Sequence, residues 1–202
     1  MNAPSGRRRP WERQTAEWLV IVLVVVALMA GWGLKSYAES RTARHIWGEA
    51  GVTLSYPLGW LASSPEPDTL RFRDTRAGGV APALEVRACA AAEGQPISQT
   101  LILQADALAL SRAQELLAYR ILESDATGVY RGAPLLRVSY VYVREEGDPF
   151  QQHLPTVMLG EDLLVYQQGR VFVFSLQAAE DGFASLRGHL RSLLDTAVFG
   201  AR

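Results

Sequence analysis

The sequence predicts an α+β domain in which helices cover a mostly antiparallel sheet, preceded by one transmembrane helix. Three observations lead to this prediction. An uncharged apolar run occupies residues 18–34. Several later segments alternate apolar and polar residues, and two of them are apolar on both faces, which requires that both faces of the sheet be covered. Amphipathic segments before and after those two strands supply the covering helices.

The composition excludes several classes of protein. The 20 Lys and Arg residues nearly balance the 21 Asp and Glu residues, and the net charge of −1 argues against a protein that binds nucleic acid. Cys89 is the one cysteine, so the chain forms no internal disulfide and no four-cysteine metal site. A hydrophobic content of 49% argues against disorder over most of the length.

The apolar run reads WLVIVLVVVALMAGWGL and predicts a signal-anchor helix over residues 18–34. As a helix it would rise about 26 Å, close to the roughly 30 Å of a bilayer's hydrocarbon core. Trp18 and Trp32 stand near its ends, where aromatic rings anchor at the lipid headgroups. Four arginines lie in residues 1–17, expected to be a cytoplasmic basic tail, against three basic residues just behind the run. This bias predicts a single pass through a bacterial inner (plasma) membrane, with the C-terminal domain on the periplasmic, extracytoplasmic side.

The region behind the anchor raises two questions, whether the chain is cleaved there and what residues 35–49 form. Residues 36–38 read Ser-Tyr-Ala, and cleavage by signal peptidase near Ala38 is an alternative to a retained anchor. The apolar core is longer than in most cleaved signals, which favours retention. Residues 35–49 are expected to form a helical or stalk-like connection in which His45 and Trp47 anchor at the membrane interface.

Residues 50–202 have the size of one exported domain. Its first part has the alternation of short strands over residues 51–57, 60–61, 69–74 and 83–89. The composition of residues 63–68, SSPEPD, predicts a turn. The side chains expected to point inward are Leu70, Phe72, Leu84 and Val86, and Cys89 is expected to pack as a small hydrophobe.

Two helices and a strand are predicted next to these. Residues 98–116 form a helix capped by Ser98, with an inward side of Leu101, Ala105, Leu108, Ala109, Arg112 and Leu116. Residues 119–125 alternate as a strand. Residues 183–198 form a closing helix capped by Asp181, whose apolar stripe opposes Arg187, Arg191 and Asp195; the stripe comprises Phe183, Leu186, Leu190, Leu193, Leu194 and Ala197.

The clearest strand predictions fall on the most apolar segments of the domain. Residues 134–144, PLLRVSYVYVR, are apolar on both faces and predict a central strand covered on both sides. Residues 163–166 and 170–176 predict a β-hairpin in which Gly169 supplies a positive φ.

The order of these segments resembles the PsbP-like (Mog/PsbP-type) domains of bacteria and thylakoids. The matching features are GVTLSYPLGW at residues 51–60, YRGAPLLRVSYVYV at 130–143, LLVYQQGRVFVFSLQA at 163–178 and the terminal amphipathic helix. The resemblance implies an α/β/α sandwich and a non-catalytic, exported or lumenal domain, often accessory to membrane complexes such as photosystem II. The chain departs from the family in what looks like a retained membrane helix, and no metal or chloride residues of the photosystem members map onto it.

No catalytic constellation is evident, so we expect no enzymatic activity, no catalytic residues and no cofactor. The nearest approach to a metal-binding cluster is Glu145, Glu146 and Asp148 with His153, for which a solvated acidic loop is the simpler interpretation. His189, beside the apolar stripe of the closing helix, is interpreted as a structural histidine.

These features together predict a membrane-anchored accessory or interaction subunit of a bacterial membrane protein complex, of the electron-transport or photosynthetic kind. Its expected partners are the lipid bilayer and other subunits of that complex, not nucleic acid. The alternative is an exported sensor or a domain that binds a small molecule or a metal.

Overall fold

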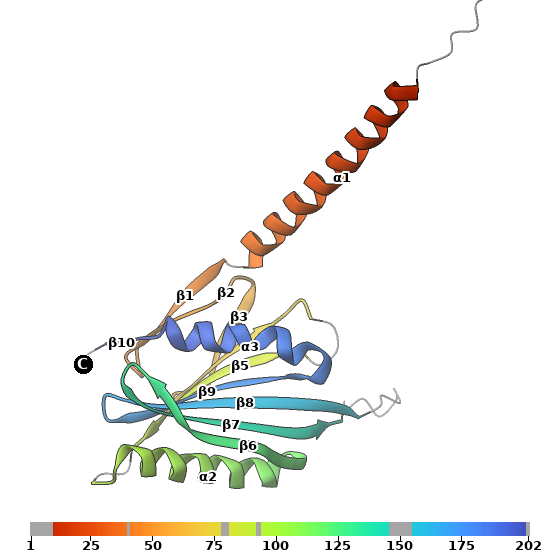
Figure 1. Ribbon diagram of the computed structural model, residues 1–202. Coiled ribbons are helices and arrows are strands. Elements are labelled where there is room, and N and C mark those ends of the chain that lie inside the picture. Colours follow the sequence, from red (N-terminus) through yellow and green to blue (C-terminus); the bar gives the residue numbers. More distant parts are fainter. Residues whose placement is uncertain (1–9, 40, 78–80, 92–93, 146–154, 201–202) are drawn as a thin grey trace, which may run out of the picture. The chain divides into compact units, whose positions relative to one another are not determined.

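The computed structural model describes residues 10–39, 41–77, 81–91, 94–145 and 155–200, and the chain divides into two compact units, Met1–Arg41 and Thr42–Arg202. The described part of the first unit is essentially one helix, α1 (Pro10–Glu39; Figure 1). Trp18 and Trp32 are 67% and 73% exposed on it. Within the described residues, no helix reaches the combined length and mean hydropathy of a membrane-spanning segment. The prediction of a helix over residues 18–34 is confirmed, whereas its place in a membrane stays a prediction.

The second unit is built on a seven-stranded sheet in which every pair of neighbours is antiparallel. In sheet order the strands are β3 (Trp60–Glu66), β4 (Thr69–Asp74), β5 (Ala83–Ala90), β9 (Arg170–Ala179), β8 (Thr156–Gln167), β7 (Ala133–Arg144) and β6 (Leu117–Tyr130). A smaller antiparallel sheet joins β1 (Thr42–Trp47), β2 (Val52–Pro57) and β10 (Val198–Phe199).

One helix covers each face of the large sheet, α2 (Ile97–Glu115) on one side and α3 (Glu180–Asp195) on the other (Figure 1). Alternation along β9 shows why. Val171 and Val173 pack in one cluster with Leu101 and Leu108 of α2, whereas Phe172 and Phe174 pack in another with Leu190, Leu193 and Leu194 of α3. The predicted α+β fold with helices on both faces of an antiparallel sheet is therefore confirmed.

The strands covered on both sides are β8 and β9 rather than the predicted residues 134–144. On β7 the side chains of Leu136, Val138, Tyr140 and Tyr142 are buried, but those on its other face are only half-buried. This face of β7 is less covered because β7 lies next to the edge strand β6, away from the centre of the sheet. The β8–β9 hairpin is confirmed, with φ of +51° at Gln168 and +76° at Gly169.

Several local predictions are wrong. Within residues 63–68, the first four extend β3, since Ser63 and Glu66 pair with β4 across a bulge. Thr42–Trp47, expected in the stalk, form β1, and Trp47 is 3% exposed in the core instead of lying at an interface. His45 on the same strand makes an edge-to-face contact with the ring of Phe72.

The predicted helix caps are also wrong. The N-cap residues are Pro96 for α2 and Ala179 for α3, and neither contributes a side-chain cap. Ser98 and Asp181 lie one residue inside their helices. Asp181 still suits the first turn of α3 because a negative charge there is favourable to the helix dipole.

Candidate functional site

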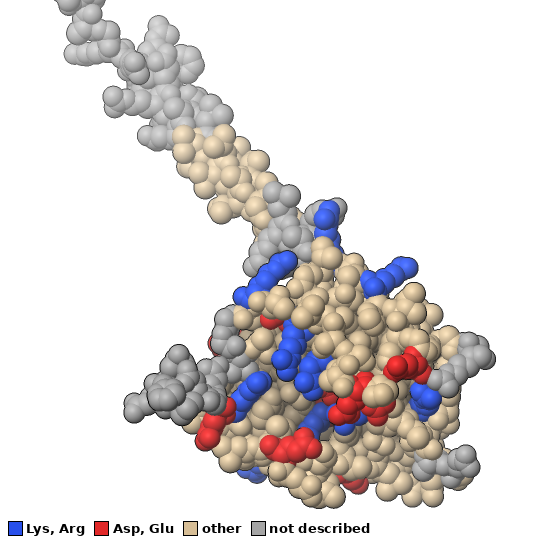
Figure 2. All heavy atoms as spheres, turned by 180° about the vertical axis from the view of Figure 1, so that it is seen from behind, with Lys and Arg blue, Asp and Glu red and all other residues tan. Residues whose placement is uncertain are grey.

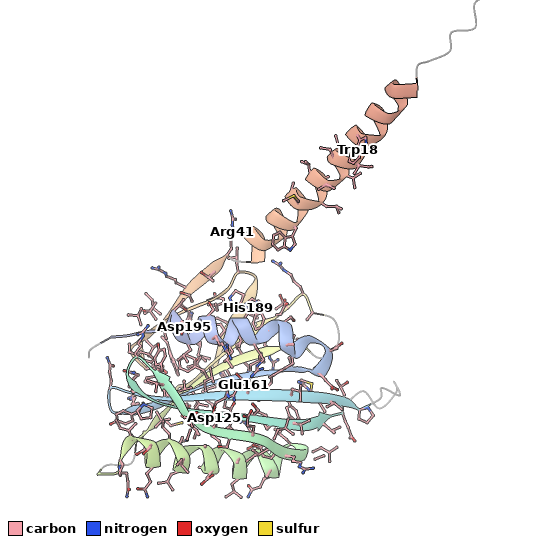
Figure 3. All side chains as sticks on the ribbon, viewed as in Figure 1. Trp18, Arg41, Asp125, Glu161, His189 and Asp195 are labelled. Atoms are coloured by element: carbon pink, nitrogen blue, oxygen red, sulfur yellow. The ribbon has the colours of Figure 1, made fainter. Side chains whose placement is uncertain are left out.

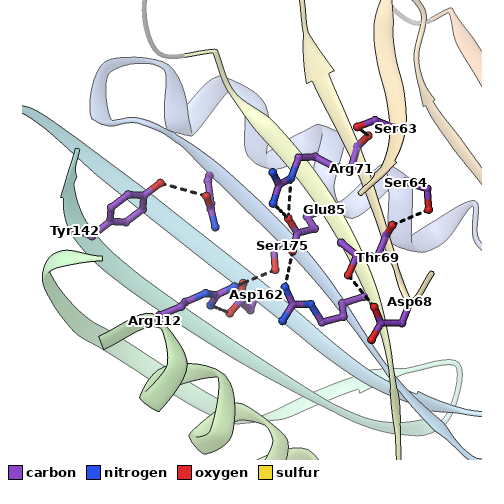
Figure 4. Close-up of polar contacts among 12 residues, drawn as sticks. Ser63, Ser64, Asp68, Thr69, Arg71, Glu85, Arg112, Tyr142, Asp162 and Ser175 are labelled. Carbon is purple, nitrogen blue, oxygen red and sulfur yellow. Dashed lines mark hydrogen bonds and ion pairs between the residues drawn. The ribbon is translucent and has the colours of Figure 1, made fainter. Parts of the chain in front are cut away.

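A cavity of about 190 Å³ lies between the C-terminal half of α2 and the strands β4, β5 and β9. Its polar lining includes Arg71 from β4, Glu85 and Arg87 from β5, Arg112 from α2, and Ser175 and Gln177 from β9. Figure 4 shows their hydrogen bonds and ion pairs, which form separate groups: Glu85 with Arg71 and Arg87, Arg112 with Asp162 and Ser175, and Gln177 with Tyr142. A pocket with several convergent polar groups is the usual form of a ligand site, which makes this cavity the candidate site.

Glu85 lies between two guanidinium groups. It is directly opposite Arg71 in the β4–β5 register, and Arg71 donates to Glu85 Oε2 from Nε at 2.9 Å and from Nη2 at 2.6 Å. Arg87 Nη2 donates to Glu85 Oε1 at 3.3 Å. The Glu85 side chain is 14% exposed, whereas those of Arg71 and Arg87 are 33% and 36% exposed. Two cations therefore share one largely buried carboxylate.

Arg112 forms the wall on the helix side. It follows Leu101 and Leu108 on the inward side of α2, and both of its Nη atoms donate to the carboxylate of Asp162 on β8. Nη2 also donates to Ser175 Oγ at 3.3 Å, and the guanidinium lies 4.4 Å from the centre of the Tyr140 ring. Burial is the largest single effect and would lower the pKa of Arg112, but the charge and hydrogen bond of Asp162, together with Tyr140 and Tyr119, outweigh it and raise that pKa. Arg112 is therefore a fixed cation whose charge Asp162 already balances.

Gln177 connects the cavity to two tyrosines of β7. Tyr142 Oη donates to Gln177 Oε1 at 3.2 Å, and Gln177 Nε2 donates to Tyr140 Oη at 3.3 Å. Both tyrosines are buried, and burial raises the pKa of each phenol. The two phenols are thus neutral hydrogen-bond partners of Gln177.

A second ion pair, in which only the carboxylate is buried, lies on the opposite face of the sheet. Glu161 of β8 is 1% exposed and accepts from Arg187 Nη2 of α3. Figure 3 shows Glu161 beneath that helix. The prediction that Arg187 simply opposes the apolar stripe is therefore wrong, because this side chain reaches back to the sheet.

Of the four residues predicted as a weak metal-binding cluster, the structure describes one. Glu145 is exposed just after β7, and Glu146, Asp148 and His153 fall outside the described residues. In the described part of the chain, no group of three or more His, Cys, Asp or Glu residues is placed to hold a metal ion.

His189 and Cys89 also lie outside the pocket. His189 is half-buried on α3, with its ring edge-to-face to Trp60 at 6.2 Å (Figure 3). Cys89 packs against the α2 cluster as predicted, and burial raises the pKa of its thiol, which keeps it in its less reactive form.

No protein-family model and no curated protein matches the sequence. Solved structures do match. The cyanobacterial PsbP protein CyanoP of Synechocystis has a TM-score of 0.58 at 14% identity, over 79% of this chain and 92% of that one. The domain has a PsbP/Mog1-like fold. The Ran-binding protein Mog1p of Saccharomyces cerevisiae agrees with this, with a TM-score of 0.53 at 11% identity, over 79% of this chain and 95% of that one.

The resemblance predicted from the sequence is therefore confirmed for the fold of this PsbP/Mog1-like domain. Its pocket was missed. One available signal was Arg112, which stands in an otherwise apolar inward stripe and so requires a buried acidic partner.

Proposed function

We propose that this chain is a non-catalytic, membrane-anchored accessory subunit whose domain binds another protein through the outward side of α2. The observation that carries the proposal is the set of apolar side chains on that side, called here the outer face of α2. Ile102, Leu103 and Leu110 are 45%, 49% and 65% exposed, and Ala107 lies exposed between them. Helices that cover a sheet usually present polar residues to water, so this face is suited to a partner.

The distribution of charge along α2 supports a docking role. Its 19 residues include three charged ones, Asp106, Arg112 and Glu115. Arg112 points inward to Asp162. Asp106 is therefore the charged residue that lies among the apolar residues of the outer face. A helix that is apolar on both sides is ordinarily buried on both sides.

The same distribution favours a protein over a lipid surface as the occupant. Helices that lie on membranes carry Lys and Arg on their polar face, which attract anionic headgroups. The only basic residue of α2, Arg112, is held by Asp162, so α2 offers such a membrane an acidic side chain and no free cation. We therefore assign the outer face of α2 to an apolar surface of another protein.

The anchor in this proposal is α1. Its support is the uncharged run over residues 18–34 and the exposure of those valines and leucines of the run whose side chains the structure describes. The charge bias around the run supports a cytoplasmic N-terminus and a domain on the other side of an inner membrane. The accessory role follows from the PsbP-like resemblance, and Mog1p, of similar fold, is by name a protein that binds another protein.

The anchor is tested on the full chain expressed in a bacterial host with a short tag at each end. Membranes are washed with alkaline carbonate, and spheroplasts are treated with protease. We expect the chain to stay in the washed membranes, with the C-terminal tag removed and the N-terminal tag protected. Release by carbonate, or protection of both tags, would contradict the anchor.

The docking surface is tested by extracting the chain from membranes of its source organism in mild detergent, followed by native electrophoresis. The wild type should migrate with a second, different protein that is identified by mass and that retrieves this chain in the reverse capture. The double variant Leu103→Ser/Leu110→Ser should lose that protein. Leu61→Ser, an equally apolar exposed residue on the far edge strand β3, is the matched control and should retain it. Migration of the wild type as a 22.2 kDa chain alone, or only with copies of itself, would overturn the proposal.

A further inference from the structure

We propose that the cavity beneath α2 binds a small oxyanion, a carboxylate or phosphate group, between Arg71 and Arg87, and that Glu85 competes with this ligand for the two guanidinium groups. The proposal concerns a different surface from the outer face of α2 and does not depend on it.

The balance of donors and acceptors in the cavity favours an anion. A guanidinium group has five N–H donors. Among contacts between described residues, Arg71 uses two bonds on Glu85, and Arg87 uses one long bond of 3.3 Å to the same carboxylate. Most donors of Arg87 therefore have no acceptor from the described chain.

The balance of charge leads to the same conclusion. Asp162 pairs with Arg112, whereas Glu85 is the one carboxylate among the described residues that pairs with both Arg71 and Arg87. The other acidic residue of the lining, Glu115, accepts from Ser111 Oγ at 2.8 Å and forms no ion pair with Arg71 or Arg87 among the described residues. The positive charge therefore exceeds the negative charge only within the group of Arg71, Glu85 and Arg87, because Glu115 and Asp162 make the cavity as a whole neutral. On the face seen in Figure 2, basic and acidic side chains lie beside one another, and that face shows no broad basic patch.

The size and burial of the cavity suit such a ligand. Its volume of about 190 Å³ exceeds the roughly 30 Å³ that one water molecule occupies in the liquid. Leu108, Leu116 and Val173 contribute an apolar part to the lining, which would contact the body of a ligand whose charged end meets the arginines. Because Glu85 is only 14% exposed, interactions at this end are less screened by water than those on the open surface.

Arginine is well suited to the proposed contact because its planar fork matches the two oxygens of a carboxylate or phosphate. In the unliganded cavity Glu85 occupies the fork of Arg71 with one oxygen, Oε2, which accepts from both Nε and Nη2, while its Oε1 accepts from Arg87. An external oxyanion would meet the same donors from the cavity side. The competition gives a clear expectation, since neutralising Glu85 should strengthen binding.

The test is isothermal titration of the full chain in uncharged detergent with inorganic phosphate, acetate and succinate as separate probes. We expect saturable binding of at least one probe, and its identity distinguishes a phosphate site from a carboxylate site. Glu85→Gln should bind severalfold more tightly, and Arg87→Gln should lose tenfold or more in affinity. Arg137→Gln is the matched control, because Arg137 contacts Glu123 and Asp125 outside the cavity.

A cooperative thermal transition in each variant establishes that it is folded, and Arg87→Lys supplies a second variant that retains the charge without the fork. Arg87→Lys should bind more weakly than the wild type and more tightly than Arg87→Gln. The proposal is overturned by absence of saturable binding in both the wild type and Glu85→Gln. Equal losses in Arg87→Gln and Arg137→Gln would overturn it too, since they indicate attraction by overall charge alone.

Discussion

Glu161 and Asp162 are consecutive residues of β8 that point to opposite faces of the sheet, and each binds an arginine from a different helix. Asp162 pairs with Arg112 of α2, and Glu161 pairs with Arg187 of α3. The alternation of side chains along a strand produces this arrangement. Both carboxylates are almost fully buried, 1% exposed for Glu161 and 2% for Asp162. Two consecutive residues of β8 therefore each form an ion pair with one of the two covering helices.

The two pairs differ in how far their arginines reach water. The side chain of Arg112 is 12% exposed, whereas that of Arg187 is 38% exposed. Loss of Asp162 would leave a buried cation unpaired, whereas loss of Glu161 would leave a cation that can turn to solvent. Adjacent acidic residues are thus expected to differ in their contribution to stability.

The first prediction concerns Asp162→Asn, which removes the charge opposite Arg112 with little change of shape. We expect the free energy of unfolding to fall by about 3–5 kcal/mol, the usual cost of an uncompensated buried charge. Urea denaturation of the full chain, followed by tryptophan fluorescence, measures the change. The double variant Arg112→Met/Asp162→Leu should recover most of the loss, because both charges are then absent. If the double variant is as unstable as Asp162→Asn, the unpaired charge is not the cause.

The second prediction is that Glu161→Gln changes the free energy of unfolding by about 1 kcal/mol or less, because ion pairs with an exposed partner contribute little. Glu161 Oε1 already lacks a hydrogen-bond partner among the described residues, as does Arg187 Nε, so the pair is incompletely satisfied. The same denaturation experiment compares this variant with Asp162→Asn. A loss as large as that of Asp162→Asn would show that exposure of the arginine does not decide the cost.

The third prediction concerns Gly160, which lies directly opposite Tyr140 in the β7–β8 register. A Cβ at Gly160 would overlap the ring of Tyr140, which is fully buried and lies against Arg112. We expect Gly160→Ala to lower the free energy of unfolding by about 1–3 kcal/mol through overpacking. Gly188→Ala is the control, since a Cβ there meets nothing within 4 Å, and it should raise helix stability by about 0.5–1 kcal/mol. Thermal unfolding of both variants decides the matter, and equal effects would exclude the Tyr140 contact as the cause.

The layers of this domain could be predicted because apolar periodicity reports which face of each element is covered. Phe72, Leu84 and Val86 alternate with polar residues, and all three are buried as expected. Trp47 was misjudged because it follows a charged segment, yet its pairing opposite Val52 brings it into the core. Tertiary contact decided its burial, and the local sequence carried no sign of it.

The pocket could not be predicted because it depends on register between strands. Arg71 and Glu85 each occupy the polar position of a half-buried strand, where an exposed side chain is the ordinary interpretation. They meet because β4 and β5 pair in the register that places them opposite one another. Gln177 joins Tyr140 and Tyr142 only because β9, β8 and β7 are neighbours in the sheet.

The fourth prediction concerns the turn of the β8–β9 hairpin, where both Gln168 and Gly169 have positive φ. Two-residue hairpin turns with positive φ at both positions favour Asn before Gly, since asparagine tolerates this conformation better than glutamine. We expect Gln168→Asn to raise the free energy of unfolding by about 0.5–1 kcal/mol. Gln167→Asn, one residue earlier at the end of β8, is the control and should give no gain. Equal gains in urea denaturation would show that the backbone of Gln168 is not responsible.

The fifth prediction concerns stability at alkaline pH. Burial raises the pKa of Tyr140 and Tyr142 above the ordinary value of about 10. Below pH 10 both phenols are neutral in the folded and unfolded chain, so they add no dependence on pH. Above it the unfolded chain ionises while the folded chain does not, so the free energy of unfolding should fall with pH by up to about 1.4 kcal/mol per unit for each tyrosine.

Tyr142→Phe isolates this effect, because the difference from the wild type cancels every other titrating group, including the Cys89 thiol, whose pKa is also raised. Between pH 7 and 9 the variant should differ from the wild type by a constant offset, which reflects the lost hydrogen bond to Gln177. From pH 10 upward its free energy of unfolding should fall less steeply than that of the wild type, so that the two curves converge or cross. Urea denaturation at half-unit steps of pH measures both slopes. Parallel curves from pH 7 to 11 would show that the Tyr142 phenol ionises as readily in the folded chain as in the unfolded one, contrary to its burial beside Gln177.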